Sequence, residues 1–125
     1  MSKIKILDCT LRDGGYINNW AFKDTHISKI LKSLVASHVD IIECGYLDDK
    51  KGIKNNSTLF DSIATADKFL TPLVSSNAQK VIMINLGDFN AKNLPHREQT
   101  SIDGIRLAFH KKDIDKAFET AYKIK

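Results

Sequence analysis

Arg12 and Asp13 stand side by side directly after the first apolar stretch of the chain, and two glycines follow them. Residues 3–7 alternate and then become apolar, which is typical of a strand that enters a core, and we expect this strand over residues 4–11. We therefore expect the pair at the C-terminal end of a strand, on a turn that glycine favours, where α/β proteins bind their ligands. The two residue types by themselves also fit an exposed ion pair at an ordinary turn.

A further acid, Glu43, lies near the end of the next apolar stretch, residues 39–45. This stretch is β-branched and nearly continuous, as in a parallel strand that is covered on both faces. Neighbouring parallel strands lie about 5 Å apart, so Arg12, Asp13 and Glu43 can meet at one end of the sheet. A carboxylate there can hold a hard divalent cation, and a fixed guanidinium can stabilise an oxyanion. Together they suit chemistry through the enolate of a 2-oxo acid.

The motif Asp-x-Thr-Leu-Arg-Asp-Gly over residues 8–14 resembles the first-strand signature of a family of metal-dependent aldolases, lyases and synthases built on a TIM barrel. The family includes 4-hydroxy-2-oxovalerate aldolase, 3-hydroxy-3-methylglutaryl-CoA lyase and isopropylmalate synthase. Residues 105–110 look like the Arg-Val-Ala-x-His segment of 4-hydroxy-2-oxovalerate aldolase, the member that the chain resembles most. The resemblance implies a divalent-metal-dependent carbon–carbon lyase that acts on a small 2-oxo acid.

The resemblance also implies roles for single residues. Asp13 would ligate the divalent metal, Mn²⁺ or Mg²⁺, while Arg12 would stabilise the enolate and Glu43 would contribute to the site. Tyr16 stands where the aldolase has a histidine thought to act as general base. A tyrosine with a pKa of about 10 is a poor base at neutral pH, so Tyr16 would donate a proton or line the pocket. His110 ends the second matching segment, and it also fits a surface histidine ahead of two lysines.

The family's remaining metal ligands are a His-x-His pair on a later strand, and no such pair occurs among the four histidines of this chain. We therefore expect residues outside this sequence to complete the metal site. Two alternatives to the lyase stay open. One is an acyl-CoA-dependent synthase of the same fold that condenses an acyl group onto a 2-oxo acid. The other is a non-catalytic barrel domain that has lost its general base. The tyrosine at position 16 supports this alternative, whereas the presence of all three charged residues argues against it.

The elements that must position these residues alternate between strands and helices. An apolar stripe predicts a helix over residues 25–37, and its members are Ile27, Ile30, Leu31, Leu34 and Val35. The other expected elements are a polar loop at 46–60, a short helix from about 59 to 71, strands at 81–86 and 102–109 with a loop between them, and a last helix from about 113.

This alternation is typical of a parallel α/β sheet. A complete (β/α)8 TIM barrel needs about 250 residues. The 125 residues of the chain are therefore expected to form the N-terminal half of a barrel, with four β/α units in residues 1–125 and the rest of the catalytic domain absent. Such a half leaves apolar strands unpaired at both edges, so we expect a homo-oligomer.

The composition excludes several classes of protein. With 42% hydrophobic and 27% charged residues, the chain has the balance of one soluble globular domain. The net charge of +4 comes from lysines scattered among acids, so nucleic acid is not expected as a partner. No apolar stretch approaches the roughly 20 residues of a membrane span, and no signal peptide is evident, so we expect a cytoplasmic protein without membrane partners. Cys9 and Cys44 are expected as buried free thiols.

Overall fold

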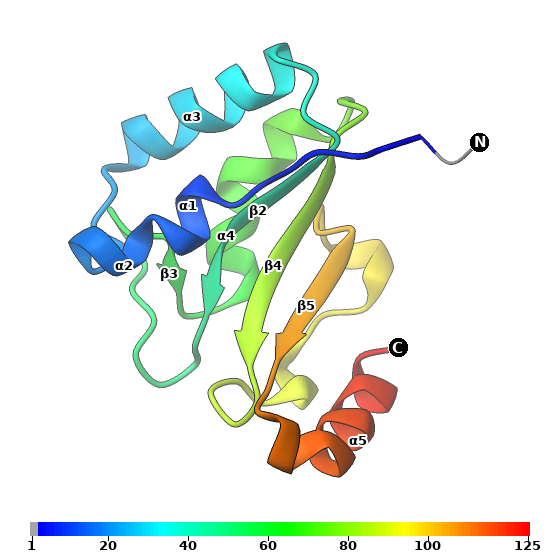
Figure 1. The fold of residues 1–125 in the computed structure, drawn as a ribbon. Coiled ribbons are helices and arrows are strands. Elements are labelled where there is room, and N and C mark those ends of the chain that lie inside the picture. The colour runs from blue at the N-terminus through cyan, green and yellow to red at the C-terminus, as the bar shows by residue number, and fades with distance from the viewer. Residues whose placement is uncertain (1–2) are drawn as a thin grey trace.

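The computed structural model describes residues 3–125, and its centre is a sheet in which every strand pair is parallel (Figure 1). The strands lie in the order β1 (Leu7–Asp8), β2 (Ile41–Leu47), β4 (Gln79–Asn85) and β5 (Gly104–Ala108). A two-residue strand, β3 (Leu59–Phe60), pairs with the end of β2 outside this path. Strands that follow one another along the chain are therefore neighbours in space, as in the first four units of a (β/α)8 barrel. The predicted α/β half barrel is confirmed.

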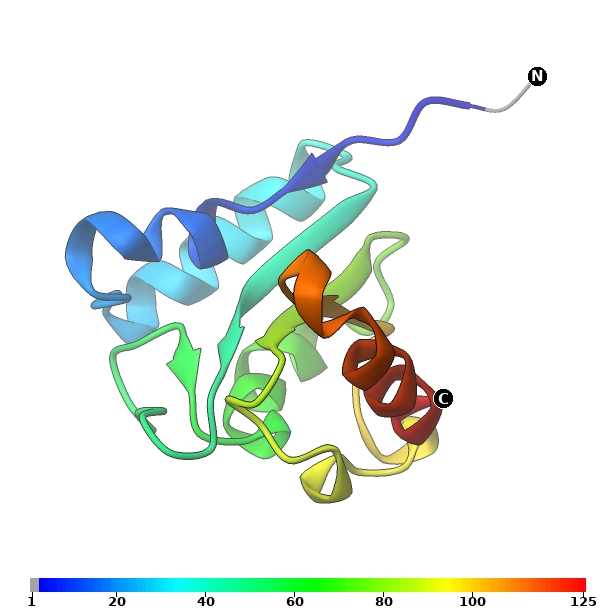
Figure 2. The ribbon, with the colours of Figure 1, turned by 60° about the horizontal axis from the view of Figure 1, so that its bottom comes forward.

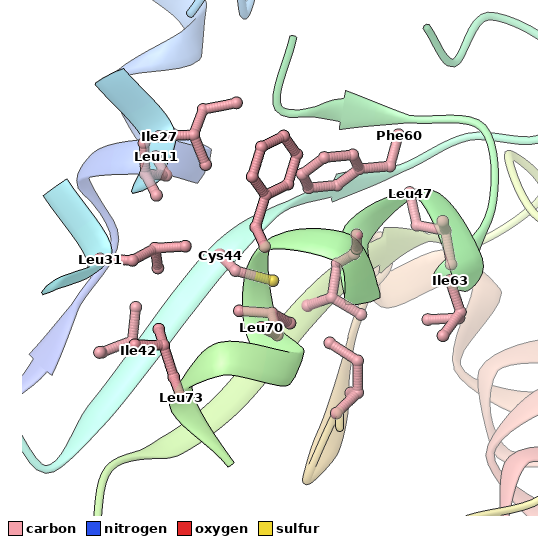
Figure 3. Close-up of a cluster of buried hydrophobic side chains, with 14 of the residues drawn as sticks. Leu11, Ile27, Leu31, Ile42, Cys44, Leu47, Phe60, Ile63, Leu70 and Leu73 are labelled. Atoms are coloured by element: carbon pink, nitrogen blue, oxygen red, sulfur yellow. The ribbon is translucent and has the colours of Figure 1, made fainter. Parts of the chain in front are cut away.

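One face of the sheet packs against α3 (Asp24–Ala36) and α4 (Ile63–Leu70), while α5 (Ile114–Ile124) lies beside β5 (Figures 1 and 2). Figure 3 shows the core between them, where Ile42 and Cys44 of β2 lie among apolar side chains of both helices. The predicted stripe of α3 belongs to this core in full. Both cysteines are free, and burial raises the pKa of the Cys44 thiol, whereas Cys9 is partly exposed. Within residues 3–125, no helix has the length and apolar composition that a bilayer crossing requires.

The first strand is shorter than the predicted one at residues 4–11, because the chain turns into a helix directly after Asp8. The Asp8 carboxylate accepts hydrogen bonds from the backbone N–H and the hydroxyl of Thr10, both at 3.0 Å. These bonds start two one-turn helices, α1 (Thr10–Asp13) and α2 (Gly15–Asn18). Arg12 and Asp13 therefore lie on a helical turn after the strand and not directly at its end.

The two glycines after Asp13 do not serve the left-handed turn that the sequence suggested. Gly14 has φ of −58°, which any residue can adopt. Glycine is required at position 15 because there is no room for a side chain: a Cβ on Gly15 would lie 1.9 Å from Cδ1 of Trp20. The indole packs against the bare backbone of α2, and this contact fixes the loop that follows the first strand.

Other element boundaries also differ from the prediction. β2 begins and ends two residues later than the expected 39–45, because its end pairs with β3 inside the segment expected as a polar loop. Leu59, which we expected on the short helix, belongs to β3. The helix itself starts at Ile63, where the Ser62 hydroxyl accepts a hydrogen bond from the Thr65 N–H. The loop around Pro95 contains two 3₁₀ turns, Ala91–Asn93 and Arg97–Gln99.

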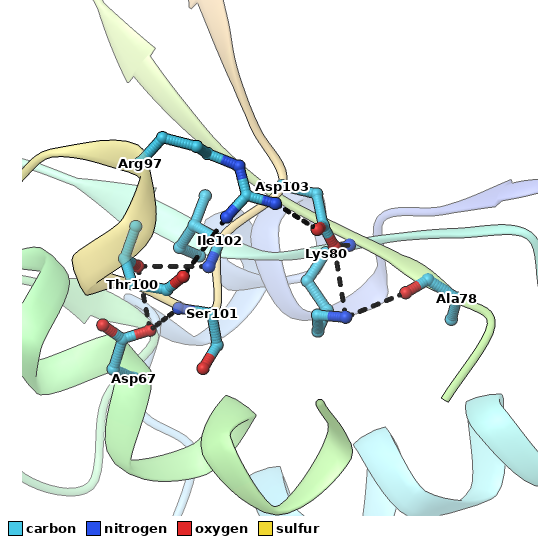
Figure 4. Close-up of polar contacts among 8 residues, drawn as sticks. All are labelled: Asp67, Ala78, Lys80, Arg97, Thr100, Ser101, Ile102 and Asp103. Carbon is cyan, nitrogen blue, oxygen red and sulfur yellow. Dashed lines mark hydrogen bonds and ion pairs between the residues drawn. The ribbon is translucent and has the colours of Figure 1, made fainter. Parts of the chain in front are cut away.

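At the N-terminal ends of β4 and β5, charged groups tie the strands to their surroundings (Figure 4). The Lys80 side chain is only 5% exposed, and its Nζ lies 3.1 Å from Oδ2 of Asp103. Arg97 approaches the other oxygen of the same carboxylate at 2.8 Å. Desolvation raises the pKa of Asp103, but the hydrogen bonds and charge of Lys80 and the charge of Arg97 outweigh it, so the pKa is lowered. This end of the sheet is opposite the expected chemistry, and such a position in a barrel serves stability.

Both edges of the sheet carry exposed apolar side chains. Ile4 and Ile6 beside β1 are 87% and 63% exposed, and Phe118 and Tyr122 on α5 are 60% and 78% exposed. We expect the 125-residue chain, expressed alone, to dimerise or aggregate, because open strands and apolar surface both favour association. Light scattering should show a smaller mean mass for Phe118→Lys, whereas Val74→Lys, which removes an equally exposed side chain away from both edges, should change little. A monomer at all concentrations would contradict this prediction.

Candidate functional site

The register of the sheet gathers polar side chains on the face that α3 and α4 do not cover, which we call the open face. Paired residues of neighbouring strands point to the same face of a sheet. Glu43 pairs with Val81, and one step further along the strands Tyr46 pairs with Met83. Met83 in turn pairs with Arg106 of β5. Because Ile82 and Ile84, the neighbours of Met83 in β4, are buried in the core, these polar residues lie on the open face.

Glu43 lies at the centre of this face between two arginines. Its side chain is completely buried, and its two oxygens accept hydrogen bonds from Nε of Arg12 and from Nη1 of Arg106. The Arg12 side chain is 14% exposed and that of Arg106 is 43% exposed. A buried carboxylate that is paired on both oxygens forms strong, directional hydrogen bonds. The arrangement fixes both guanidinium groups and leaves the three residues with a net positive charge.

The Arg12 guanidinium is held from several sides. Besides Glu43, it contacts Oδ1 of Asp13 through Nη1 at 3.0 Å. Partial burial lowers the pKa of Arg12, but the hydrogen bond and charge of Glu43 and the charge of Asp13 outweigh this effect and raise it. The backbone carbonyl of Arg12 accepts a hydrogen bond from the indole Nε1 of Trp20 at 2.8 Å. A guanidinium that is fixed and always charged is suited to stabilise a negative charge that develops on a substrate.

Asp13 has the chemistry expected of a metal ligand, but it stands alone. Its carboxylate is 62% exposed, and among the residues that the structure describes only Arg12 contacts it, at Oδ1. Within residues 3–125, no group of three histidine, cysteine, aspartate or glutamate side chains is arranged to hold a metal ion. A single hard oxygen ligand fits Mg²⁺ or Mn²⁺, which accept carboxylates together with water and substrate oxygens. Asp13 therefore fits one position of a metal site whose other protein ligands would come from elsewhere.

Tyr16 and His110 lie outside the cluster around Glu43. Tyr16 is 62% exposed on α2 and packs edge-on against Trp20, with 4.7 Å between the ring centroids. Its hydroxyl has no hydrogen-bond partner in the described part of the chain. His110 is exposed after β5, where its backbone carbonyl accepts a hydrogen bond from the Asp113 N–H. Of the five predicted site residues, the structure thus brings together Arg12, Asp13 and Glu43.

The comparisons with known proteins support the fold. No family model matches the chain, and no curated protein matches it. Among solved structures, the chain is similar to the "Crystal structure of the N-terminal domain of a putative aldolase from Bacteroides vulgatus", with a TM-score of 0.67 and 30% sequence identity. The fold is aldolase-like. The match covers 97% of this chain, which spans 40% of the length of that chain.

Sequence reasoning missed Arg106 as a site residue, although it lies inside the segment that resembles the aldolase. Arg106 alternates with Ile105 and Leu107, both of which pack against the core, so the pattern itself places its side chain on the opposite face. Nothing in the pattern names Glu43 as its partner, because the two residues are 63 positions apart. Trp20 was visible as an aromatic residue in the loop after the motif, but its bond to the Arg12 carbonyl depends on the fold.

Proposed function

We propose that this chain supplies the N-terminal half of the active site of a divalent-metal-dependent aldolase, which cleaves a carbon–carbon bond of a 2-oxo acid through an enolate. The observation that carries the proposal is the buried Glu43, which fixes Arg12 beside the exposed Asp13 on the helical turn that follows the C-terminal end of β1. The aldolase-like fold and the resemblance of residues 8–14 support the same conclusion.

Each residue of the cluster has a distinct role in this proposal. Arg12 donates hydrogen bonds to the enolate oxygen as charge develops there, and Glu43 keeps the guanidinium in place. Arg106 is open enough to contact the substrate while one of its nitrogens stays on Glu43, and a guanidinium recognises a carboxylate well. Asp13 would hold Mg²⁺ or Mn²⁺, which when bound supplies Lewis-acid polarisation of the substrate.

Pyruvate release from a 4-hydroxy-2-oxo acid tests the proposed activity. The complete gene product, supplied with Mn²⁺, should release pyruvate from 4-hydroxy-2-oxopentanoate, and a chelator should stop the release. Residues 1–125 alone should show no turnover, because they supply the carboxylate of Asp13 but no His-x-His pair. Failure of the complete protein to act on any 4-hydroxy-2-oxo acid would contradict the proposal, as would turnover by the 125-residue chain.

Asp13→Asn should weaken Mn²⁺ binding by roughly tenfold or more, because an amide oxygen lacks the charge that the metal prefers. Isothermal titration of the complete protein with Mn²⁺ measures this effect directly. Asp115→Asn, which makes the same change on the exposed surface of α5, is the matched control and should bind Mn²⁺ like the unmodified protein. Equal affinities for the Asp13 variant and this control would exclude Asp13 as a ligand.

A further inference from the structure

Aldol cleavage requires a base that removes the proton of the substrate's 4-hydroxyl group, and the proposed function leaves this base unassigned. Tyr16, at the expected position, is a poor base at neutral pH. The chain offers another carboxylate near the C-terminal end of the sheet, that of Asp88 in the turn after β4. Asp88 was not among the predicted site residues, and the inference below rests on the proposed function.

The Asp88 carboxylate is oriented by two side chains on the same oxygen. The Tyr46 hydroxyl donates a hydrogen bond to Oδ2 at 2.8 Å, and the Asn85 amide donates to the same atom at 3.1 Å. Burial and the hydrogen bond to Asp88 raise the pKa of Tyr46, so its hydroxyl keeps its proton and acts as a donor. Oδ1 accepts no hydrogen bond from any residue in 3–125, and Asp88 is partly exposed. One oxygen is therefore fixed and the other is free to accept a proton.

The turn does not need this carboxylate. The Asp88 backbone N–H donates to the Asn85 carbonyl at 3.0 Å, and the Asp88 carbonyl accepts from the Asp49 N–H at 3.2 Å. These two hydrogen bonds are made by backbone atoms and do not involve the Asp88 carboxylate. Asp49 provides a useful contrast, since its carboxylate accepts from the Asn90 N–H and the Asn93 amide and so has a structural role in the same loops.

A continuous chain of contacts joins Asp88 to Arg12. Tyr46, which binds Asp88, follows Glu43 on the same strand and lies one step nearer the C-terminal end of the sheet. The Tyr46 ring packs against Trp20, with 5.9 Å between the centroids, and Trp20 binds the Arg12 carbonyl. The carboxylate and the segment that carries the guanidinium are thus both anchored to the same two aromatic residues, Tyr46 and Trp20.

We infer that Asp88 is the general base of the aldol cleavage and that Tyr46 and Asn85 position it. Oδ1 of Asp88 takes the proton from the 4-hydroxyl group of the substrate. The electrons of that O–H bond form the C4 carbonyl, and the C3–C4 bond breaks, so that an aldehyde leaves. The electron pair of the broken bond forms the enolate of pyruvate, whose oxygen Arg12 stabilises. C3 then takes a proton from water, and the hydroxide that this leaves takes up the proton held by Asp88.

A comparison of two substrates distinguishes the proton transfer to Asp88 from the formation of the enolate. Cleavage of 4-hydroxy-2-oxopentanoate needs a base, whereas loss of CO₂ from oxaloacetate gives the same enolate without one. In the complete gene product, Asp88→Asn should lower kcat for cleavage by about 10²-fold to 10⁴-fold, the usual contribution of general base catalysis. Decarboxylation of oxaloacetate should change less than about threefold in this variant. Asp49→Asn, the same change at the structural carboxylate, should leave the ratio of the two rates as it is.

Tyr46→Phe tests the positioning role. It removes one of the two donors that orient Oδ2 of Asp88, so kcat for cleavage should fall while KM and the decarboxylation of oxaloacetate change little. Circular dichroism should show that both variants fold.

Equal losses of cleavage and decarboxylation in Asp88→Asn, or no loss of either, would overturn the assignment while the proposed function stood. If the unmodified protein carried out neither reaction, both the assignment and the proposed function would be wrong.

Discussion

Arg12→Lys should lower kcat for cleavage of a 4-hydroxy-2-oxo acid by about 10²-fold or more, which is the usual loss when one donor to an oxyanion is removed. Lysine keeps the positive charge but loses the planar arrangement that binds Glu43 through Nε and Asp13 through Nη1 at the same time. The enolate charge appears only during the reaction, so the loss should fall on kcat more than on KM. Steady-state kinetics of the complete protein measures both constants.

The matched control for this prediction is Arg97→Lys, which changes a largely exposed arginine at the opposite end of the sheet. It should leave kcat within about twofold of the unmodified protein, because surface ion pairs contribute little. Arg12→Lys should also slow the decarboxylation of oxaloacetate, which passes through the same enolate. A rise in KM with an unchanged kcat would mean that Arg12 only binds the substrate.

Glu43→Gln should lower the free energy of unfolding by about 3 to 5 kcal/mol, as expected when one partner of a buried ion pair is removed. The carboxylate is completely buried and accepts hydrogen bonds from two guanidinium groups. Glutamine has nearly the same shape but no charge, and its amide group cannot accept from both arginines. The largest part of the loss comes from the positive charges of Arg12 and Arg106, because the variant removes the carboxylate between them and leaves only the exposed Asp13 beside Arg12.

Urea unfolding followed by circular dichroism measures this change, with Glu119→Gln on the exposed face of α5 as the control. The control should stay within about 0.5 kcal/mol of the unmodified protein. Adding Arg106→Met to Glu43→Gln should recover part of the lost stability, because it removes the positive charge of Arg106, which has lost its partner Glu43. A loss below about 1 kcal/mol for Glu43→Gln would mean that the ion pairs do not hold the open face together.

The amino-acid sequence by itself determined the alternation of strands and helices and the position of Arg12 and Asp13 after the first strand. The apolar stripe of α3 and the apolar stretches of β2 and β4 were readable because local backbone geometry repeats every 3.6 or 2 residues. That same geometry placed Arg12 and Asp13 just after the first strand, but Glu43, expected near the end of its strand, is the third residue of β2 because β2 extends to Leu47. Each of these conclusions depends on residues that are close together in the chain.

The tertiary structure alone decided which side chains meet. Asp8 ends β1 early, so Arg12 reaches Glu43 from a helical turn, and the register shifts in β2 between Glu43 and Tyr46. The bond between Glu43 and Arg106 joins positions 63 residues apart, and that between Tyr46 and Asp88 joins positions 42 apart. Such contacts depend on the register and the twist of strands that are remote in sequence, and a shift of one residue would turn the side chains to the other face. Local periodicity carries no information about that register, so it could not identify these partners.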